Sequence, residues 1–168
     1  GKHMKKLSVG ILGFGTVGGG TYEILTKNHD LITQRTGVSI DVVKALVRKH
    51  REGIPAHLTT EDPDDILKEP SIDVVVETMG GIEPATAFML QAMENGKHVV
   101  TANKAAVAAN YEKLQAAAAK NQVQFLFEAS VGGGIPVLTA IQNALQGNAV
   151  LEVMGIVNGT TNYILTKM

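Results

Sequence analysis

Residues 6–18, Lys6-Leu-Ser-Val-Gly-Ile-Leu-Gly-Phe-Gly-Thr-Val-Gly18, decide the fold of this chain. The apolar run from Leu7 to Leu12 predicts a buried strand, and the six residues that follow match the pattern G-x-G-x-x-G. A helical pattern begins directly behind them. This order of strand, glycine turn and helix is the context in which the pattern binds a dinucleotide.

Each glycine of the turn has a separate task. Gly13 permits the tight turn, Gly15 lets a pyrophosphate approach the backbone, and Gly18 lets the helix pack close to the strand. The helix N-terminus adds free N–H groups and a partial positive charge for the phosphates. The alternative is a glycine turn without a ligand. We expect the whole turn to bind the cofactor, that is Gly13, Phe14, Gly15, Thr16, Val17 and Gly18.

Composition predicts a folded protein and limits the kinds of partner that it can bind. The 168 residues are 45% hydrophobic and 18% charged, enough for one domain, or for one domain and the start of another. A net charge of −1 gives no electrostatic case for nucleic acid or an anionic membrane. No apolar run approaches the roughly 18 residues of a membrane span. The absence of cysteine excludes thiol nucleophiles, and a cytoplasmic location is the default expectation.

Apolar, β-branched runs alternate with helical patterns along the chain, which predicts a parallel, doubly wound, Rossmann-like sheet. We expect strands at 7–12, 38–47, 72–77, 97–101, 123–128 and 151–157. We expect helices at 17–34, 63–68, 83–95, 104–120 (with a break near Asn110), 136–146 and 163–168.

The same patterns predict a division into domains. Residues 1–4 look like the remnant of a cloning tag, and 5–134 form the dinucleotide-binding domain. Residues 135–168 read as the first strand and helix of a second domain, for substrate and dimerisation. The last predicted helix stops after one turn, so we expect the chain to be a piece of a larger protein.

The end of the second predicted strand sets the cofactor preference. Many NAD enzymes place a carboxylate there to hold the ribose 2′-hydroxyl. Here the strand ends in the basic run 47–51, while Asp41 comes too early and Glu52 too late. Arg48 is best placed to meet a 2′-phosphate with its bidentate fork. The alternative is a solvated basic loop. We predict NADP, with dual use of NAD left open.

Five loops follow the carboxyl ends of predicted strands, the edge where open α/β sheets bind ligands. Lys104 in one of them falls in the first turn of a helix that Asn103 could cap, where a cation opposes the helix dipole. An ammonium group facing a substrate could stabilise the negative charge that develops on a reduced carbonyl oxygen, or donate the proton. The alternative is an exposed lysine that tolerates the mismatch.

Glu128 precedes another glycine-rich turn, whose carbonyl oxygens suit a hard cation. The alternative is a strand-end carboxylate bonded to N–H groups of the turn. From the spacing alone both interpretations stay open.

Several motifs together resemble homoserine dehydrogenase. They run in the right order from about Lys6 to Met168, and those around Lys104 and Asn158 are much more specific than the glycine pattern. The motifs are Gly13-Phe-Gly-Thr-Val-Gly18, Val76-Glu-Thr-Met-Gly-Gly81, Gly96-Lys-His-Val-Val-Thr-Ala-Asn-Lys104, Phe127-Glu-Ala-Ser-Val-Gly-Gly-Gly-Ile-Pro136 and Gly155-Ile-Val-Asn-Gly-Thr-Thr-Asn-Tyr-Ile-Leu165.

The resemblance implies NAD(P)-dependent interconversion of L-homoserine and L-aspartate 4-semialdehyde, on the way to threonine and methionine. It places Lys104 beside the nicotinamide and substrate, for cofactor binding and proton transfer, and Thr78 on the nicotinamide side. It also gives Arg48 the 2′-phosphate contact. A sodium site is implied at Glu128, Val131, Gly133 and Ile135.

The family's remaining substrate-binding and catalytic residues lie beyond Met168, so we expect this chain to bind cofactor but to catalyse weakly or not at all. The resemblance also implies a homodimer or larger homo-oligomer for the parent. Two other functions stay open: another Rossmann-fold reductase of a small carbonyl acid, and a non-catalytic NAD(P)-sensing domain.

Overall fold

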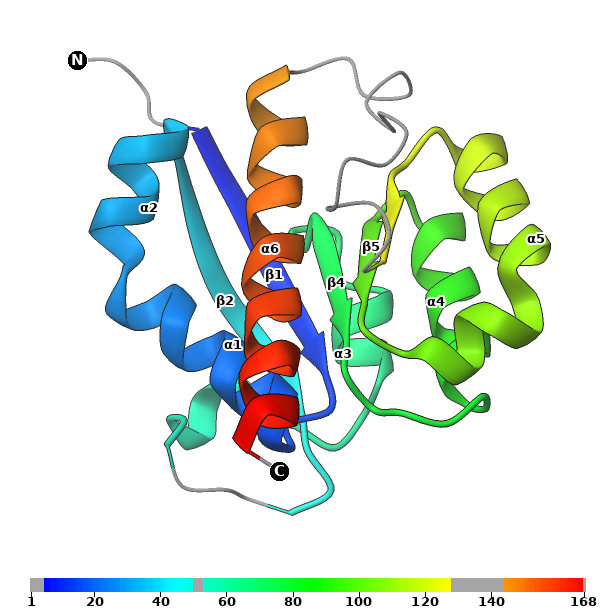
Figure 1. The fold of residues 1–168 in the computed structure, drawn as a ribbon. Helices are drawn as coiled ribbons and strands as arrows, with labels where there is room; N and C mark the ends of the chain where they lie inside the picture. The colour runs from blue at the N-terminus through cyan, green and yellow to red at the C-terminus, as the bar shows by residue number, and fades with distance from the viewer. Residues whose placement is uncertain (1–4, 50–52, 128–143, 168) are drawn as a thin grey trace.

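A computed structural model describes residues 5–49, 53–127 and 144–167 of the chain (Figure 1). Strands and helices alternate over most of this length, as the sequence predicts. The elements are β1 (Lys5–Leu12), α1 (Thr16–Lys27), α2 (His29–Thr36), β2 (Val38–Leu46), η1 (Ala56–Leu58), β3 (Thr59–Thr60), α3 (Asp64–Leu67), β4 (Val74–Glu77), α4 (Ala85–Glu94), β5 (His98–Thr101), α5 (Lys104–Asn121), β6 (Phe125–Leu126) and α6 (Ala144–Lys167).

The strands form one six-stranded sheet in the order β3-β2-β1-β4-β5-β6, and every pairing is parallel. The chain winds outward from β1 in one direction and then from β4 in the other, so the strand order reverses between these two central strands. This is the doubly wound arrangement, and its ligand crevice lies where the order reverses. The predicted fold class is confirmed.

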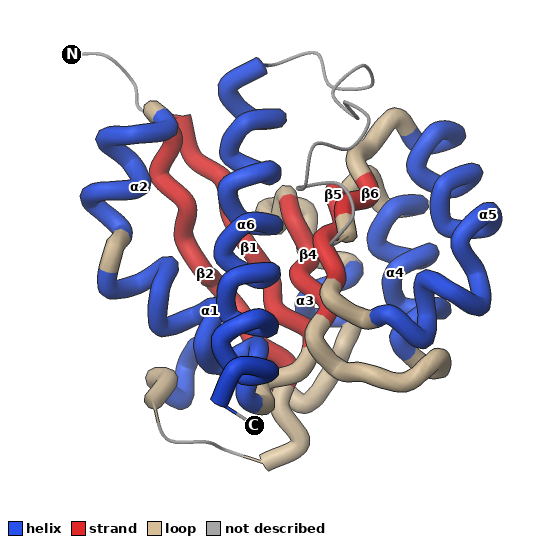
Figure 2. Tube along the Cα trace, in the orientation of Figure 1, coloured by secondary structure: helices blue, strands red, loops and turns tan. Residues whose placement is uncertain are grey.

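Helices cover both faces of the sheet (Figure 2), and strand residues alternate between two buried clusters. Val74 and Val76 pack with α1, α2 and α6, whereas Val75 packs with α3, α4 and α5. Because both faces are covered, the strands are apolar throughout, as parallel sheets require. No helix within the described ranges is long and apolar enough to cross a membrane.

Residues 151–157 were expected to be a strand, and the structure shows that this expectation is wrong. They lie inside the single helix α6, which also contains residues 163–167 of the helix predicted at 163–168. A short apolar run fits a buried strand and a buried helix equally well. Burial decides here, because the buried residues recur with helical spacing: Ala149, Val150, Val153, Met154, Val157 and Thr160.

Helix α6 packs closely on α1. A Cβ built on Gly20 of α1 would lie 2.5 Å from Cγ2 of Thr160, so this glycine allows the two helices to approach. Arg35 of α2 also donates to Glu152 of α6, which ties the helix to the same face. These contacts of α6 with α1 and α2 stabilise the helical conformation of this segment. They join segments far apart in the chain, so no local sequence pattern contains them.

Three further expectations need correction. The predicted helix at 17–34 is two helices, because the backbone leaves helical geometry at Asn28, which forms the N-cap of α2. The segment before the predicted helix 63–68 contains an edge strand that was not expected, β3, and the helix itself is shorter, at Asp64–Leu67. Strand β6 covers only Phe125–Leu126 of the predicted 123–128. The predicted helix at 136–146 lies largely outside the described residues.

The break in α5 is confirmed at Asn110, whose φ of −135° is non-helical. Its side-chain amide donates to Thr86 Oγ1 of α4 at 3.3 Å. The bond links the broken helix to its neighbour on the same face of the sheet.

The start of α2 is joined to β2 by a polar cluster around His29. Nδ1 lies 3.1 Å from Asp30 Oδ1, and Nε2 lies 2.9 Å from Asp41 Oδ1. Ser39 Oγ, 3.0 Å from Nε2, already donates its one hydrogen to Asp41, so it can only accept from the histidine. Each partner is therefore an acceptor, and the ring is favoured with both nitrogens protonated. The bond to Asp30, with the charge of Asp41, raises the pKa of His29 above its ordinary 6.5.

This cluster predicts a pH-dependent contribution to stability. A raised folded-state pKa means that the stabilisation is fully present below the unfolded pKa and is lost as the pH rises through the folded pKa. We expect the free energy of unfolding of the wild type to exceed that of His29→Gln by more at pH 5.5 than at pH 8. Urea denaturation at the two pH values measures this.

NMR titration of the His29 ring supplies the direct check, with the resonance assigned from His29→Gln. The midpoint should lie above that of the same ring in urea and should fall in Asp30→Asn and in Asp41→Asn. A folded-state midpoint at or below the unfolded one would contradict the assignment.

Candidate functional site

The central strands end level with one another, and this register builds the site. Leu12 at the end of β1 pairs with Leu46 of β2 on one side and with Glu77 of β4 on the other. Glu77 in turn pairs with Thr101 of β5. The loops that follow therefore leave from one edge of the sheet, as expected from the sequence. The glycine-rich turn that Glu128 precedes, also expected at this edge, lies outside the described residues.

The glycine turn after β1 has the backbone that its pattern predicts. Gly13 has a φ of +97°, a conformation that strongly favours glycine, and a Cβ there would lie 3.1 Å from the backbone of Met79. A Cβ on Gly18 would collide with the carbonyl oxygen of Gly13. A Cβ on Gly15 would meet nothing within 4 Å, so this residue faces open space. The two outer glycines thus hold the turn, and the middle one leaves room for a ligand.

Helix α1 begins directly behind this open position. Its N-cap is Gly15, which has no side chain to cap the helix, and its first turn contains no acid. The first bond within the helix comes from the N–H of Gly19 to the carbonyl of Gly15, at 2.8 Å. The preceding N–H groups, including that of Val17, have no partner of this kind and suit an anion.

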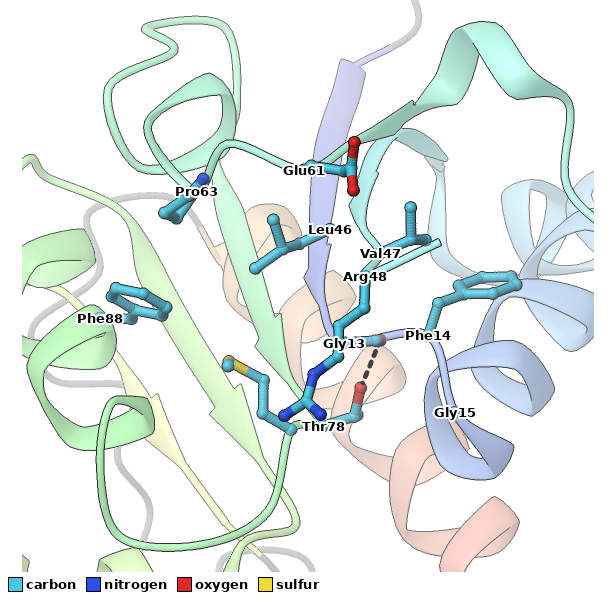
Figure 3. Close-up of a pocket in the computed structure, with 11 residues that line it drawn as sticks. Gly13, Phe14, Gly15, Leu46, Val47, Arg48, Glu61, Pro63, Thr78 and Phe88 are labelled. Atoms are coloured by element: carbon cyan, nitrogen blue, oxygen red, sulfur yellow. Dashed lines mark hydrogen bonds between the residues drawn. The ribbon is translucent and has the colours of Figure 1, made fainter. Parts of the chain in front are cut away.

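The side chains in and around the glycine turn mainly make contacts within the protein. Phe14 is 8% exposed and packs edge-to-face on Tyr22, with ring centroids 5.7 Å apart. Val17 packs against the core, and Thr16 faces a hollow beside α1. Thr78, predicted for the nicotinamide side, donates its hydroxyl to the carbonyl of Gly13 at 2.8 Å and so braces the turn (Figure 3).

A cleft of about 630 Å³ opens at the tips of β1, β2 and β4. Figure 3 shows the side chain of Arg48 reaching across it towards Thr78. One cavity thus brings together Arg48, Thr78 and the first half of the glycine turn, residues 13–15, all predicted as site residues. The second half of the turn, residues 16–18, does not line it. The lining is completed by Leu46, Val47, Glu61, Pro63, Met79 and Phe88.

Lys104 lines a second cavity, of about 500 Å³, on the β5 side of the same edge. It is exposed as the first residue of α5, and Asn103 before it caps the helix by accepting from the N–H of Ala106 at 3.0 Å. The predicted cap is confirmed. The other walls are mainly apolar and include Val107 and Phe127. Arg48 and Lys104 therefore belong to neighbouring cavities rather than to a single one.

Glu77, given no role in the sequence analysis, organises this edge. Its carboxylate is fully buried at the tip of β4. Oε2 accepts from the backbone N–H groups of Met79 at 2.8 Å and Gly80 at 3.2 Å, and Oε1 accepts from the hydroxyl of Thr101 at 2.5 Å. The sequence contains a signal for this role of Glu77. A carboxylate at the end of an apolar strand, at the edge where ligands bind, is unusual unless it has hydrogen-bond partners or a function there.

Asn103 extends the same network. Its amide lies 3.4 Å from Glu77 Oε2 and donates to the carbonyl of Gly81 at 2.6 Å, while its own N–H donates to Thr101 Oγ1 at 3.0 Å. The residue that caps α5 is thus bonded to the tips of β4 and β5. The backbone position of Lys104, the next residue, follows from these bonds.

Glu61 is a second residue that the sequence analysis missed. It follows β3, the two-residue strand that pairs with the end of β2, and it lines the cleft near Val47. Only the β-branched pair Thr59-Thr60 hints at this strand in the sequence. The predicted sodium ligands Glu128, Val131, Gly133 and Ile135 lie outside the described residues. Among the residues that the structure describes, no group of three or more His, Cys, Asp or Glu could hold a metal ion.

Comparisons with known proteins identify the family to which this chain belongs. The model described as "Homoserine dehydrogenase, NAD binding domain" matches residues 13–128, and the model described as "Homoserine dehydrogenase" matches residues 136–168. The resemblance drawn from the sequence motifs is confirmed.

Individual relatives agree. Homoserine dehydrogenase of Bacillus subtilis is 41% identical over 98% of this chain and 39% of its own length. That of Pseudomonas aeruginosa is 45% identical over 98% of this chain and 38% of its own length. The crystal structure of homoserine dehydrogenase from Thiobacillus denitrificans superposes with a TM-score of 0.71 at 47% identity, over 85% of this chain and 34% of that one. The chain thus spans about two fifths of the length of the curated relatives.

The network around Glu77 predicts a large effect from a small change. In Glu77→Gln an NH₂ group replaces one acceptor oxygen and faces a donor, so a buried bond is lost. We expect the free energy of unfolding to fall by about 1–3 kcal/mol, the usual cost of an unsatisfied buried polar group. Urea denaturation measures it.

Glu94→Gln is the matched control, because Glu94 is exposed on α4 and its substitution removes the same charge. Its midpoint should stay near that of the wild type. Equal losses in the two variants would show that the buried bonds of Glu77 do not stabilise this edge.

Proposed function

Because this chain belongs to the homoserine dehydrogenase family, we propose that it forms the NADP-binding part of an enzyme that interconverts L-homoserine and L-aspartate 4-semialdehyde. One observation carries the proposal. The open position at Gly15, the free N-terminus of α1 and Arg48 converge on a single cleft, with Lys104 in the adjoining cavity. These features fit a dinucleotide that bridges the two cavities.

The pyrophosphate would lie over Gly15 and the first turn of α1. The open space above this glycine and the N–H groups of the helix start support this placement. The adenosine half would then occupy the larger cleft, where the guanidinium of Arg48 can meet a 2′-phosphate. This gives the preference for NADP, with NAD as the second choice.

The nicotinamide half would extend to the cavity of Lys104. The nicotinamide supplies or accepts the hydride when bound. Lys104 acts on the substrate oxygen: its ammonium stabilises the charge that develops there and delivers or takes up the proton. Asn103 holds the lysine at the start of α5, and Thr78 braces the glycine turn between the two cavities.

Several parts of the proposal rest on the family resemblance. They are a sodium ion at Glu128, Val131, Gly133 and Ile135, a homodimeric or larger parent, and the division at residues 134 and 135. We propose a cytoplasmic location separately, as the default for a chain without cysteine. Since the chain spans about 39% of a relative, we expect the chain by itself to bind cofactor and to catalyse weakly or not at all.

Calorimetric titration of the chain with NADPH and with NADH tests cofactor binding. For Arg48→Ala we expect NADPH binding to weaken by about 1.5–3 kcal/mol, the range for hydrogen bonds to charged groups, with NADH nearly unchanged.

Lys49→Ala is the control for Arg48→Ala. Lys49 is exposed in the same loop but does not line the cleft, so it should affect both cofactors only slightly. Equal losses for NADPH and NADH in Arg48→Ala would overturn the 2′-phosphate contact. A wild-type chain that binds neither cofactor would overturn the binding site.

The reaction is tested in a protein that extends this chain to the length of its relatives. L-Homoserine should drive NADP⁺ reduction, followed by absorbance at the nicotinamide band, and Lys104→Ala should lower the rate by about 10²–10⁴-fold, the range for a general acid–base group. Cofactor binding without turnover of homoserine would identify a sensor or a reductase of another substrate.

A further inference from the structure

Near the tip of β2 the sequence shows only basic residues, but the structure places an acidic residue, Glu61, in the same cleft. Parallel pairing of Ala45 with Thr59 and of Leu46 with Thr60 brings β3 beside the end of β2. The N–H of Val47 then donates to the carbonyl of Thr60 at 2.8 Å, which continues the pairing past the end of β2. Arg48 and Glu61 are the next residues on each side, so they leave from adjacent strand tips.

The acids that follow Glu61 are engaged within their own loop. Asp62 Oδ1 accepts from the N–H of Asp64 at 3.0 Å, and Asp65 Oδ2 accepts from the hydroxyl of Thr60 at 2.5 Å. These bonds shape the start of α3. Glu61 instead lines the cleft, where Figure 3 shows its carboxylate beside Val47, on the wall from which Arg48 extends.

We propose that Glu61 is a specificity-determining residue, whose carboxylate accepts a hydrogen bond from the ribose 2′-hydroxyl of NAD(H) and disfavours the 2′-phosphate of NADP(H). This inference rests on the proposed function, since it takes the adenosine half of the cofactor to occupy this cleft. A carboxylate at the tip of the second strand is the usual partner of that hydroxyl. Here the neighbouring edge strand provides it.

Under this proposal Arg48 and Glu61 favour different substituents at the ribose 2′ position. The guanidinium favours a phosphate by charge and by its bidentate fork. The carboxylate favours a hydroxyl, which can donate to it, and repels a phosphate. A cleft with both groups accepts either cofactor, and the balance between the two side chains sets the ratio of their affinities.

The test compares dissociation constants of the full chain for NADH and NADPH by calorimetry, in the wild type, in Glu61→Ala and in Glu94→Ala. Both glutamates are exposed, and only Glu61 lines the cleft. For Glu61→Ala we expect NADH binding to weaken by about tenfold, as for the loss of a hydrogen bond to a charged group, while NADPH binding is unchanged or tighter. Glu94→Ala should leave both constants as in the wild type.

Two shorter ligands locate the effect. Adenosine 5′-monophosphate and adenosine 2′,5′-bisphosphate differ only in the phosphate at the ribose 2′ position and lack the nicotinamide, so they bind without the second cavity. Glu61→Ala should shift this pair in the same direction as NADH and NADPH. A ratio of affinities that stays at the wild-type value in Glu61→Ala overturns the inference and leaves the proposed function intact. A wild type that binds none of the four ligands overturns both.

Discussion

The buried carboxylate of Glu77 is the interaction on which the functional edge depends. It accepts from the turn after β4 and from Thr101 of β5, and Asn103 adds its amide to the same network. A carboxylate is costly to bury unless its oxygens are bonded, and here neutral N–H and O–H donors surround them. The edge of the sheet is thereby held in one conformation, and the loops that carry the candidate site residues start from fixed points.

Strand register converts this fixed edge into a site. Because β1, β2, β4 and β5 end level, the residues that follow them meet without any long loop. The strands themselves are apolar and buried on both faces, and helices α1 to α6 cover them. The buried strands thus provide stability, and the loops that follow them provide the ligand-binding residues, as is usual in doubly wound sheets.

The cleft combines charges of opposite sign from adjacent strand tips. Arg48 comes from the long strand β2, and Glu61 comes from β3, a strand of two residues. A strand of only two residues therefore helps to form a wall of the cleft. An edge strand of this size has little to add to the core, and its effect is to fix where the following residue stands.

The sequence by itself determined five of the six strands of the sheet, the glycine turn, the cap at Asn103 and the break at Asn110. Each of these follows from a local cause: apolar runs, the conformational freedom of glycine, and the hydrogen-bonding side chain of asparagine. Only the tertiary structure decided that 151–157 is helical, that the first helix breaks at Asn28, that β3 brings Glu61 into the cleft, and that Glu77 is fully bonded. The physical reason is the same throughout: an apolar run, a two-residue strand or a buried carboxylate takes its conformation from partners far away in the chain, and local periodicity does not contain them.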